Sequence, residues 1–321
     1  MPLIDKPLSE LKEYQGINPR PADFDEYWEK ALEEMRSVER NVELQKADFQ
    51  APGATCYDLY FTGVRNARIH CQLIVPDNIK GKAPAVIEFH GYSGWTGEFS
   101  NKLCWSNCGF VVAAMDCRGQ GGYSEETGGV KGTTQNGFII RGLDDCPENL
   151  YFRHVFLDTA ELADIVMNFD FVDETKVGVM GGSQGGGLTL ACASLEPRIA
   201  KAWSCYPFLS DYRRVWEMDL AKGAYAELCT FFRNFDPTHS KEDEIFTRLG
   251  YIDIQNLTPR IKGEVVMSTG LMDTICPPST QFAAYNKINS KKRTIIYPDY
   301  GHEGLRGNSD EKFKFFLGFL K

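Results

Sequence analysis

Residues 176–193 read KVGVMGGSQGGGLTLACA, and this stretch decides the fold. It opens with a valine-rich run typical of a buried strand and closes with Leu188 to Ala193, which suits a helix. Between the two, Ser183 stands in a Gly-x-Ser-x-Gly pattern flanked by Gly181 and Gly185. A serine on a sharp turn from strand to helix is typical of a nucleophile elbow, which exposes the hydroxyl at the edge of a sheet. The stretch therefore predicts a reactive hydroxyl at Ser183.

The glycines around Ser183 fit this interpretation better than the two alternatives. The elbow strains the serine backbone and brings the neighbouring chain very close, so small residues are needed beside it. The turn also places the hydroxyl at a helix N-terminus, where developing negative charge is favoured. A phosphate-binding loop is the first alternative, but the Gly-Lys-Ser/Thr that it requires is missing. A plain tight turn is the second.

Short apolar runs alternate with helical patterns on both sides of this stretch. Strand candidates lie at 55–62 and 67–75, which form a pair with a turn at 63–66, and at 84–90, 110–115, 176–180, 201–205, 263–268 and 293–297. Alternation of this kind predicts a largely parallel sheet covered on both faces. We therefore expect the α/β class: an α/β-hydrolase fold with a mostly parallel sheet flanked by helices, an N-terminal extension and a helical insertion.

The chain is expected to form one domain over residues 1–321. Residues 1–40 form the predicted extension, irregular up to residue 21 and then helical, with Asp23 or Asp25 as the cap. Residues 212–256 interrupt the strand–helix alternation and are rich in aromatic and charged side chains. We interpret them as a helical insertion over the top of the sheet, either a cap or an oligomer contact.

Composition narrows the range of partners. The formal net charge is −9, with 43% hydrophobic and 25% charged residues, which is ordinary for a globular protein. An acidic chain is a poor match for nucleic acid or an anionic membrane, because both select clustered Lys and Arg. We expect neither partner. The N-terminus lacks a basic segment followed by a long apolar run, and no stretch has the length of a membrane span.

The 10 cysteines are scattered and form no Cys-x-x-Cys pair or zinc-finger spacing. Free thiols, mostly buried, in a chain without a secretion signal suit a reducing compartment, so a cytoplasmic location is expected. Cys104 and Cys108 are close enough in sequence to form a disulfide or a metal pair, which is the alternative.

A serine nucleophile in this fold needs an acid and then a histidine further along the chain. Only His239 and His302 follow Ser183, and His302 stands after the last strand candidate, in a loop with glycines on both sides. Asp273 follows the strand candidate at 263–268 and precedes His302, whereas its rivals Asp253 and Asp236 follow no strand. Asp273 would orient the imidazole of His302 and stabilise the imidazolium.

Two backbone N–H groups are expected to form an oxyanion hole. One belongs to Gln184, directly after the nucleophile, and the other to the loop that follows the strand ending at His90. Tyr92 in that loop is the candidate donor. We interpret His90 itself as a structural residue rather than a base.

With these residues assembled, the chain resembles carbohydrate esterase family seven, the acetyl xylan esterases and cephalosporin-C deacetylases. Three motifs occur in the family's order: RGQ at 118–120, GGSQG at 181–185 and HE at 302–303. The segments GFIIRG at 137–142 and GLMDTICPPST at 270–280 are also similar to family sequence. The likeness extends from about residue 7 to the end of the chain.

The resemblance implies Ser183, Asp273 and His302 as the catalytic triad, with Tyr92 and Gln184 as oxyanion donors. It implies removal of acetyl groups from xylo-oligosaccharides and small molecules such as cephalosporin C, and a homohexamer. Two further residues of the RGQ motif, Arg118 and Gln120, are expected to support the site rather than to react. The chain departs from the family at Gly223, where a proline is expected before an aromatic residue, so the shape of the acyl pocket is open.

The residues and the resemblance together predict a serine esterase that needs no metal and no organic cofactor. Its partner would be a small acetylated sugar or antibiotic, and Tyr92 and Ile275 would form the walls of a small acyl pocket. Three alternatives stay open: an esterase of other acyl specificity, a peptidase of the same fold, and a catalytically silent interaction protein. A peptidase normally carries a large gating domain, for which 321 residues leave no room.

Overall fold

The computed structural model describes residues 4–128 and 137–321, and its strands form one sheet. The spatial order of the strands is β1-β2-β3-β5-β4-β6-β7-β8-β9. The strands are β1 (Glu43–Lys46), β2 (Ala54–Gly63), β3 (Ala67–Pro76), β4 (Ala83–Phe89), β5 (Val111–Met115), β6 (Val172–Gly182), β7 (Lys201–Cys205), β8 (Glu264–Gly270) and β9 (Lys292–Tyr297).

The sheet is antiparallel at one end and parallel over the rest. β1, β2, β3 and β5 pair antiparallel, whereas β5, β4, β6, β7, β8 and β9 pair parallel. The carboxyl ends of the parallel strands therefore meet at one edge, where side chains from distant parts of the sequence come together. The predicted α/β-hydrolase fold class is confirmed.

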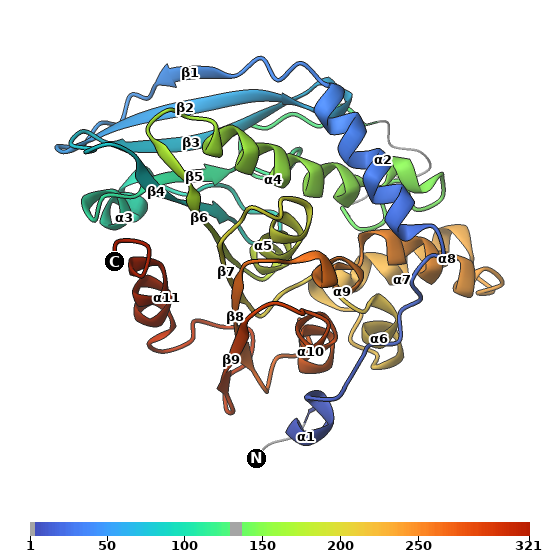
Figure 1. Ribbon diagram of the computed structural model, residues 1–321. Helices are drawn as coiled ribbons and strands as arrows, with labels where there is room; N and C mark the ends of the chain where they lie inside the picture. Colours follow the sequence, from blue (N-terminus) through green and yellow to red (C-terminus); the bar gives the residue numbers. More distant parts are fainter. Residues whose placement is uncertain (1–3, 129–136) are drawn as a thin grey trace.

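Helices cover both faces of the sheet (Figure 1). On one face lie α3 and α11, and on the other lie α4, α5 and α10, with α2 packed outside α4. The helices are α1 (Leu8–Leu11), α2 (Phe24–Ser37), α3 (Leu103–Asn107), α4 (Tyr151–Met167), α5 (Gln184–Leu195), α6 (Tyr212–Glu217), α7 (Ala226–Phe235), α8 (Glu242–Leu249), α9 (Ile254–Leu257), α10 (Pro278–Asn286) and α11 (Asn308–Leu317).

The alternation of side chains along each strand builds a separate core on each face. The register places Ile87 of β4 beside Ala113 and Val179, and all three belong to the larger core under α4 and α5. The adjacent residues Val86 and Val112 belong to the second core, under α3 and α11. Both faces of the central strands are buried, so these strands read as nearly continuous apolar runs.

Each predicted strand is present, with ends shifted by a few residues. One strand is additional: β1, whose four side chains are all exposed and carry no alternating apolar pattern. The predicted irregular start contains the short helix α1, and residues 1–3 of the expected extension lie outside the described residues. The expected cap of α2 is corrected, because Asp23 stands at the N-cap position without a capping hydrogen bond. Its carboxylate accepts the Tyr251 hydroxyl instead.

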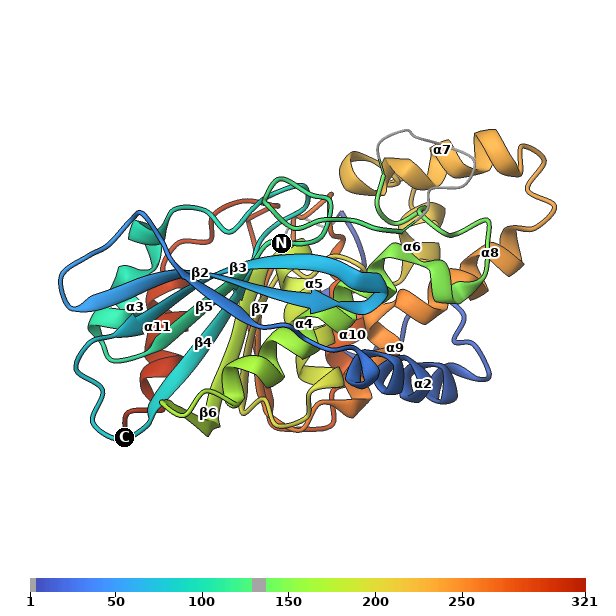
Figure 2. The same ribbon diagram turned by 90° about the horizontal axis from the view of Figure 1, so that it is seen from above.

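The segment 212–256 contains α6, α7, α8 and the start of α9. Seen from above, α7 and α8 project beyond the strands at one end of the molecule (Figure 2). Apolar side chains from each of these helices join the larger core, among them Val215, Phe231 and Phe246. In the described part of the chain, every helix is too short or too polar to cross a membrane.

Candidate active site

Ser183 lies on the sharp turn between β6 and α5, with φ 57° and ψ −121°. This backbone conformation is strained for a residue with a side chain, so surrounding contacts must hold it. The Ser183 N–H donates to the carbonyl of Cys205 at 3.0 Å, and its own carbonyl accepts the N–H groups of Gly187 and Phe208, each at 3.0 Å. The end of β7 and the start of α5 therefore hold the serine from both sides.

Two glycines let the chain pass through this turn. A Cβ on Gly185 would lie 2.0 Å from the carbonyl oxygen of Phe89, and one on Gly181 would lie 2.4 Å from the carbonyl carbon of Gly185. Neither distance is possible for a real side chain, and both clashes are with backbone. Close approach of the chain is thus the reason for the glycines on either side of Ser183.

Ser183, His302 and Asp273 form one chain of hydrogen bonds. Nε2 of His302 lies 3.0 Å from Oγ of Ser183, and Nδ1 lies 2.8 Å from Oδ2 of Asp273. The three residues follow β6, β9 and β8 respectively, at the same edge of the sheet. The geometry is that of a nucleophile, a base and an orienting acid.

Asp273 is fully buried, and its other oxygen is held by backbone. Oδ1 accepts the N–H groups of Ile275 and Cys276 at 2.9 and 2.8 Å, which leaves Oδ2 directed at His302. The rival candidates lie in other networks: Asp253 caps α9, Asp236 accepts from Ser240, and His239 pairs with Glu242.

The loop after β4 brings Tyr92 to the same edge of the sheet. Among the described residues, the Tyr92 backbone N–H has no hydrogen-bond acceptor. The Gln184 N–H is the first of helix α5, and such N–H groups have no acceptor within their own helix. Neither amide therefore has a protein acceptor among the described residues, as an oxyanion hole requires. His90 is structural, because Nδ1 donates to Gly91 and Nε2 accepts the Cys117 N–H, and burial lowers its pKa.

Gln120 links the loop of Tyr92 to the first residue of α5, Gln184. Its Oε1 accepts the backbone N–H of Ser93 at 2.9 Å, and its side-chain amide pairs with that of Gln184 at 2.9 to 3.0 Å. Arg118 lies deeper and does not reach the triad. It is fully buried and forms a bidentate pair with Asp158, at 2.7 and 2.6 Å.

Cys276 adds a third potential metal ligand beside Asp273 and His302, with the three ligand atoms within 4.8 Å of one another. The arrangement fits a metal poorly. Burial raises the pKa of the Cys276 thiol well above its usual value, and the second oxygen of Asp273 already accepts two backbone N–H groups. Asp273 and His302 already form a hydrogen bond with each other through Oδ2 and Nδ1.

Ile275, two residues after Asp273, is the second predicted wall of the acyl pocket, beside Tyr92. A Cβ placed on Gly223, in the insertion, would lie 3.6 Å from Cδ1 of Ile275. Gly223 has a φ of 55°, which the ring of a proline cannot adopt. The backbone at position 223 therefore excludes a proline there.

Sequence reasoning missed Tyr206, whose ring packs against that of His302. Tyr206 directly follows β7, so the rule that site residues follow strand ends was a signal for it. It also missed Glu227 of α7, which accepts the hydroxyl of Tyr92 and for which the local sequence carries no signal.

The ten thiols differ in burial. All ten cysteines are free, including Cys104 and Cys108, so the alternative of a disulfide between these two is wrong. Six thiols are buried, Cys229 is half-buried, and Cys104, Cys108 and Cys146 are exposed. The expectation of buried thiols thus holds for the core positions only.

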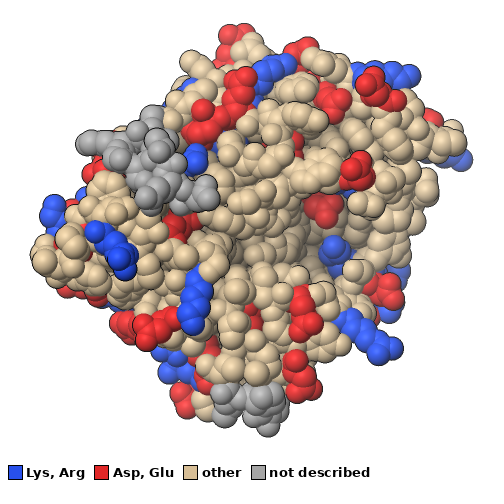
Figure 3. Space-filling view, turned by 180° about the vertical axis from the view of Figure 1, so that it is seen from behind, with Lys and Arg blue, Asp and Glu red and all other residues tan. Residues whose placement is uncertain are grey.

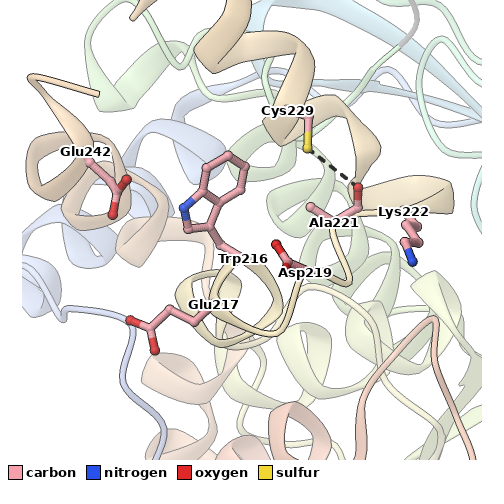
Figure 4. Close-up of a pocket in the computed structure, with 7 residues that line it drawn as sticks. All are labelled: Trp216, Glu217, Asp219, Ala221, Lys222, Cys229 and Glu242. Atoms are coloured by element: carbon pink, nitrogen blue, oxygen red, sulfur yellow. Dashed lines mark hydrogen bonds between the residues drawn. The ribbon is translucent and has the colours of Figure 1, made fainter. Parts of the chain in front are cut away.

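The surface around these elements carries mixed charge. On the face shown in Figure 3, Lys and Arg are interspersed with Asp and Glu around a largely uncharged, hollowed centre. A separate hollow in the insertion (Figure 4) contains none of the triad residues; it is lined by Trp216, Glu217, Asp219, Ala221, Lys222, Cys229 and Glu242.

Known proteins are similar to this chain in both sequence and structure. Acetyl xylan esterase 1 from Thermoanaerobacterium sp. JW/SL YS485 is 60% identical and superposes with a TM-score of 0.98, over 99% of this chain and 100% of that one. The acetyl xylan esterase from Paenibacillus sp. R4 is 34% identical with a TM-score of 0.93, over 98% and 99% of the two chains.

A curated relative, the acetyl esterase Axe7A of Xylanibacter ruminicola (strain ATCC 19189 / DSM 19721 / CIP 105475 / JCM 8958 / 23), is 30% identical over 288 residues. The match covers 88% of this chain but 63% of Axe7A, so the chain spans less than two thirds of that relative. The model of the family described as acetyl xylan esterase (AXE1) matches residues 1–319. This protein therefore belongs to the acetyl xylan esterase family.

Proposed function

We propose that the protein is a serine esterase that removes acetyl groups from acetylated xylo-oligosaccharides and from other small acetyl esters such as cephalosporin C. The observation that carries the proposal is the hydrogen-bonded chain from Ser183 through His302 to the buried Asp273. Membership of the acetyl xylan esterase family supports acetyl as the acyl group.

In the first step, Nε2 of His302 takes the proton of the Ser183 hydroxyl while Oγ attacks the ester carbonyl carbon. The carbonyl electron pair moves onto oxygen, and the tetrahedral intermediate collapses as the protonated His302 donates to the leaving sugar oxygen. Acetyl-Ser183 remains. Water then attacks it with His302 again as the base, and acetate and free Ser183 result. The Asp273 carboxylate holds Nδ1–H and stabilises the imidazolium.

The oxyanion of each tetrahedral intermediate is bound by the backbone N–H groups of Tyr92 and Gln184. Donors of this kind stabilise the transition state by about 3 kcal/mol each in comparable enzymes. All of the steps use protein side chains and amides, so the mechanism requires no metal and no organic cofactor.

The acyl pocket is proposed to lie between Tyr92 and Ile275, with Gly223 next to Ile275. A small pocket admits acetyl and excludes longer chains by steric contact. Comparable rates on the acetyl and octanoyl esters of p-nitrophenol would contradict this pocket and favour an esterase of other acyl specificity.

We also propose a cytoplasmic homohexamer. Buried free thiols support the location, because reducing compartments keep cysteines unpaired. The hexamer is proposed from the resemblance to carbohydrate esterase family seven. Light scattering coupled to size-exclusion chromatography tests it: a mass near six times that of the chain is expected, and a monomer would contradict it.

The activity is tested with p-nitrophenyl acetate and a panel of acetylated xylo-oligosaccharides, other acetylated sugars and cephalosporin C, with acetate release as the readout. Ser183→Ala is expected to abolish release from each substrate. An unchanged rate in Ser183→Ala would overturn the proposal. Cleavage of peptides but not esters by the unaltered protein would favour a peptidase.

A further inference from the structure

Glu227 is a buried carboxylate in the first turn of α7, and the proposed reaction does not use it. Only 5% of the residue is exposed. One oxygen accepts the hydroxyl of Tyr92, and the other accepts the backbone N–H of Ile140 at 3.0 Å. The carboxylate thus connects the helical insertion with two loops that are distant from it in sequence.

The hydrogen-bond donors around Glu227 stabilise its carboxylate. Burial raises its pKa, while the Tyr92 hydroxyl and the backbone N–H groups of 138–140 oppose that rise. Gly137 lies so close that an added Cβ would stand 2.8 Å from Oε2 of Glu227. A buried carboxylate is costly unless it is hydrogen-bonded, so an apolar side chain would serve packing alone better.

Tyr92 is held on several sides by these contacts. Its ring meets the rings of Phe138 and Phe208 edge to face, with centroids 5.2 and 5.7 Å apart. Its hydroxyl is anchored on Glu227, and the next residue, Ser93, donates its N–H to Gln120. Ser93 has a φ of 58°, so this short loop is strained and depends on such anchors.

We infer that Glu227 is a positioning residue for the oxyanion hole. Anchored at the hydroxyl, the Tyr92 side chain cannot swing, and its backbone N–H stays aimed at the oxygen on which negative charge develops. Because Glu227 belongs to the insertion, the oxyanion hole is complete only when the insertion is packed in this position. The inference rests on the proposed function, because it assigns Glu227 to the reaction of Ser183.

The first test compares Glu227→Gln, Tyr92→Phe and the double variant with p-nitrophenyl acetate. Loss of the anchor should lower kcat by about 10- to 100-fold, less than the full loss of a donor, with KM nearly unchanged. The double variant should be no slower than the slower single variant, because both remove one interaction. Glu161→Gln, a matched change of a buried carboxylate in α4, should keep the original kcat.

The second test separates positioning from general loss of structure. A small alkylboronic acid that forms a tetrahedral adduct with Ser183 fills the hole, so its affinity should fall by the same factor as kcat/KM in Glu227→Gln. If Glu227→Gln does not fold, Tyr92→Phe removes the same hydrogen bond and leaves Glu227 on its backbone donors. Additive single effects, a change in KM alone, or unchanged boronate affinity would overturn the inference.

Ser183→Ala, measured on the same substrate, distinguishes failure of the proposed function from failure of the inference about Glu227. If Ser183→Ala keeps its rate, the proposed function fails and the inference fails with it. If Ser183→Ala is inactive while Glu227→Gln keeps full kcat and boronate affinity, only the role of Glu227 is refuted.

Discussion

The ring of Tyr206 packs against the imidazole of His302, with ring centroids 4.6 Å apart and planes inclined by 51°. Both ring nitrogens of His302 are taken by Asp273 and Ser183, so Tyr206 supports the flat side of the imidazole. The Tyr206 backbone has a φ of 33° and donates its N–H to Ser268 at 2.8 Å. An aromatic residue in strained backbone beside the base is expected to fix the tilt of that base.

Replacing Tyr206 with alanine should therefore lower kcat by about 10- to 100-fold, because a base displaced by about 1 Å loses its alignment with the nucleophile. Tyr206→Phe keeps the ring and should stay within about threefold of the original rate. Steady-state kinetics with p-nitrophenyl acetate measures both. Full activity in Tyr206→Ala would show that Asp273 alone orients the histidine.

Asp273→Asn should lower kcat by about 10⁴-fold, as the same change does in a serine protease with this triad. The asparagine amide stabilises the wrong tautomer of His302, with the proton on Nε2. In that tautomer, Nε2 cannot accept the proton of the Ser183 hydroxyl. Asp299→Asn, at an exposed carboxylate in the loop leading to His302, is the matched control and should be active. A loss of less than about tenfold in Asp273→Asn would argue against the acid assignment.

Gly185→Ala should destabilise the fold by about 3 kcal/mol, because the new Cβ would lie 2.0 Å from the backbone carbonyl oxygen of Phe89. Gly304→Ala is the control, since a Cβ there meets nothing within 4 Å. Its effect should stay within about 0.5 kcal/mol. Urea denaturation followed by fluorescence measures both variants, and equal stabilities would contradict the steric explanation of the elbow.

Glu161 should make stability depend on pH. It is fully buried in α4, lies 3.4 Å from Nε of Arg40, and forms no hydrogen bond with a described residue. Burial raises its pKa from 4.5 to about 8. Between these values the folded state keeps a proton that the unfolded state releases, so this contribution to stability is full below pH 4.5 and lost as pH rises through about 8.

The expected slope is about 1.4 kcal/mol per pH unit within that window. Glu161→Gln keeps the shape without the ionisable group, so the variant should gain stability relative to the original protein as pH rises from 5 to 8. Urea unfolding at both pH values measures the difference. A difference that does not change with pH would contradict the raised pKa.

Gly223→Ala should narrow the acyl pocket, because the added Cβ would stand 3.6 Å from Cδ1 of Ile275. The ratio of kcat/KM for acetyl over butyryl esters of p-nitrophenol should rise by about 10-fold, the lower end of the effect of one methylene in an apolar pocket. The positive φ costs about 1 kcal/mol of stability with alanine. A similar change at Gly53, where φ is 85° and nothing lies within 4 Å, controls for that strain and should leave the ratio unchanged.

The order of the catalytic candidates was readable from the sequence because each one follows a strand. Ser183, Asp273 and His302 come after β6, β8 and β9, and parallel strands bring their carboxyl ends to one edge. Apolar runs identified those strands: residues 177–180 of β6 and 265–270 of β8 are buried, and the isoleucines of β9 are half-buried. β1 carries four exposed side chains, so no hydrophobic pattern marked it.

By itself, the sequence determined the fold class and predicted the nucleophile, its partners and the two amides, since each depends on local pattern and on order along the chain. Only the tertiary structure decided the tilt of His302 against Tyr206 and the anchoring of Tyr92 by Glu227, a residue 135 positions away. The first contact depends on how the segments after β7 and β9 meet, and the second on how the insertion packs against the sheet. Packing between distant segments follows from complementary shape and buried hydrogen bonds, which leave no periodic trace in either segment.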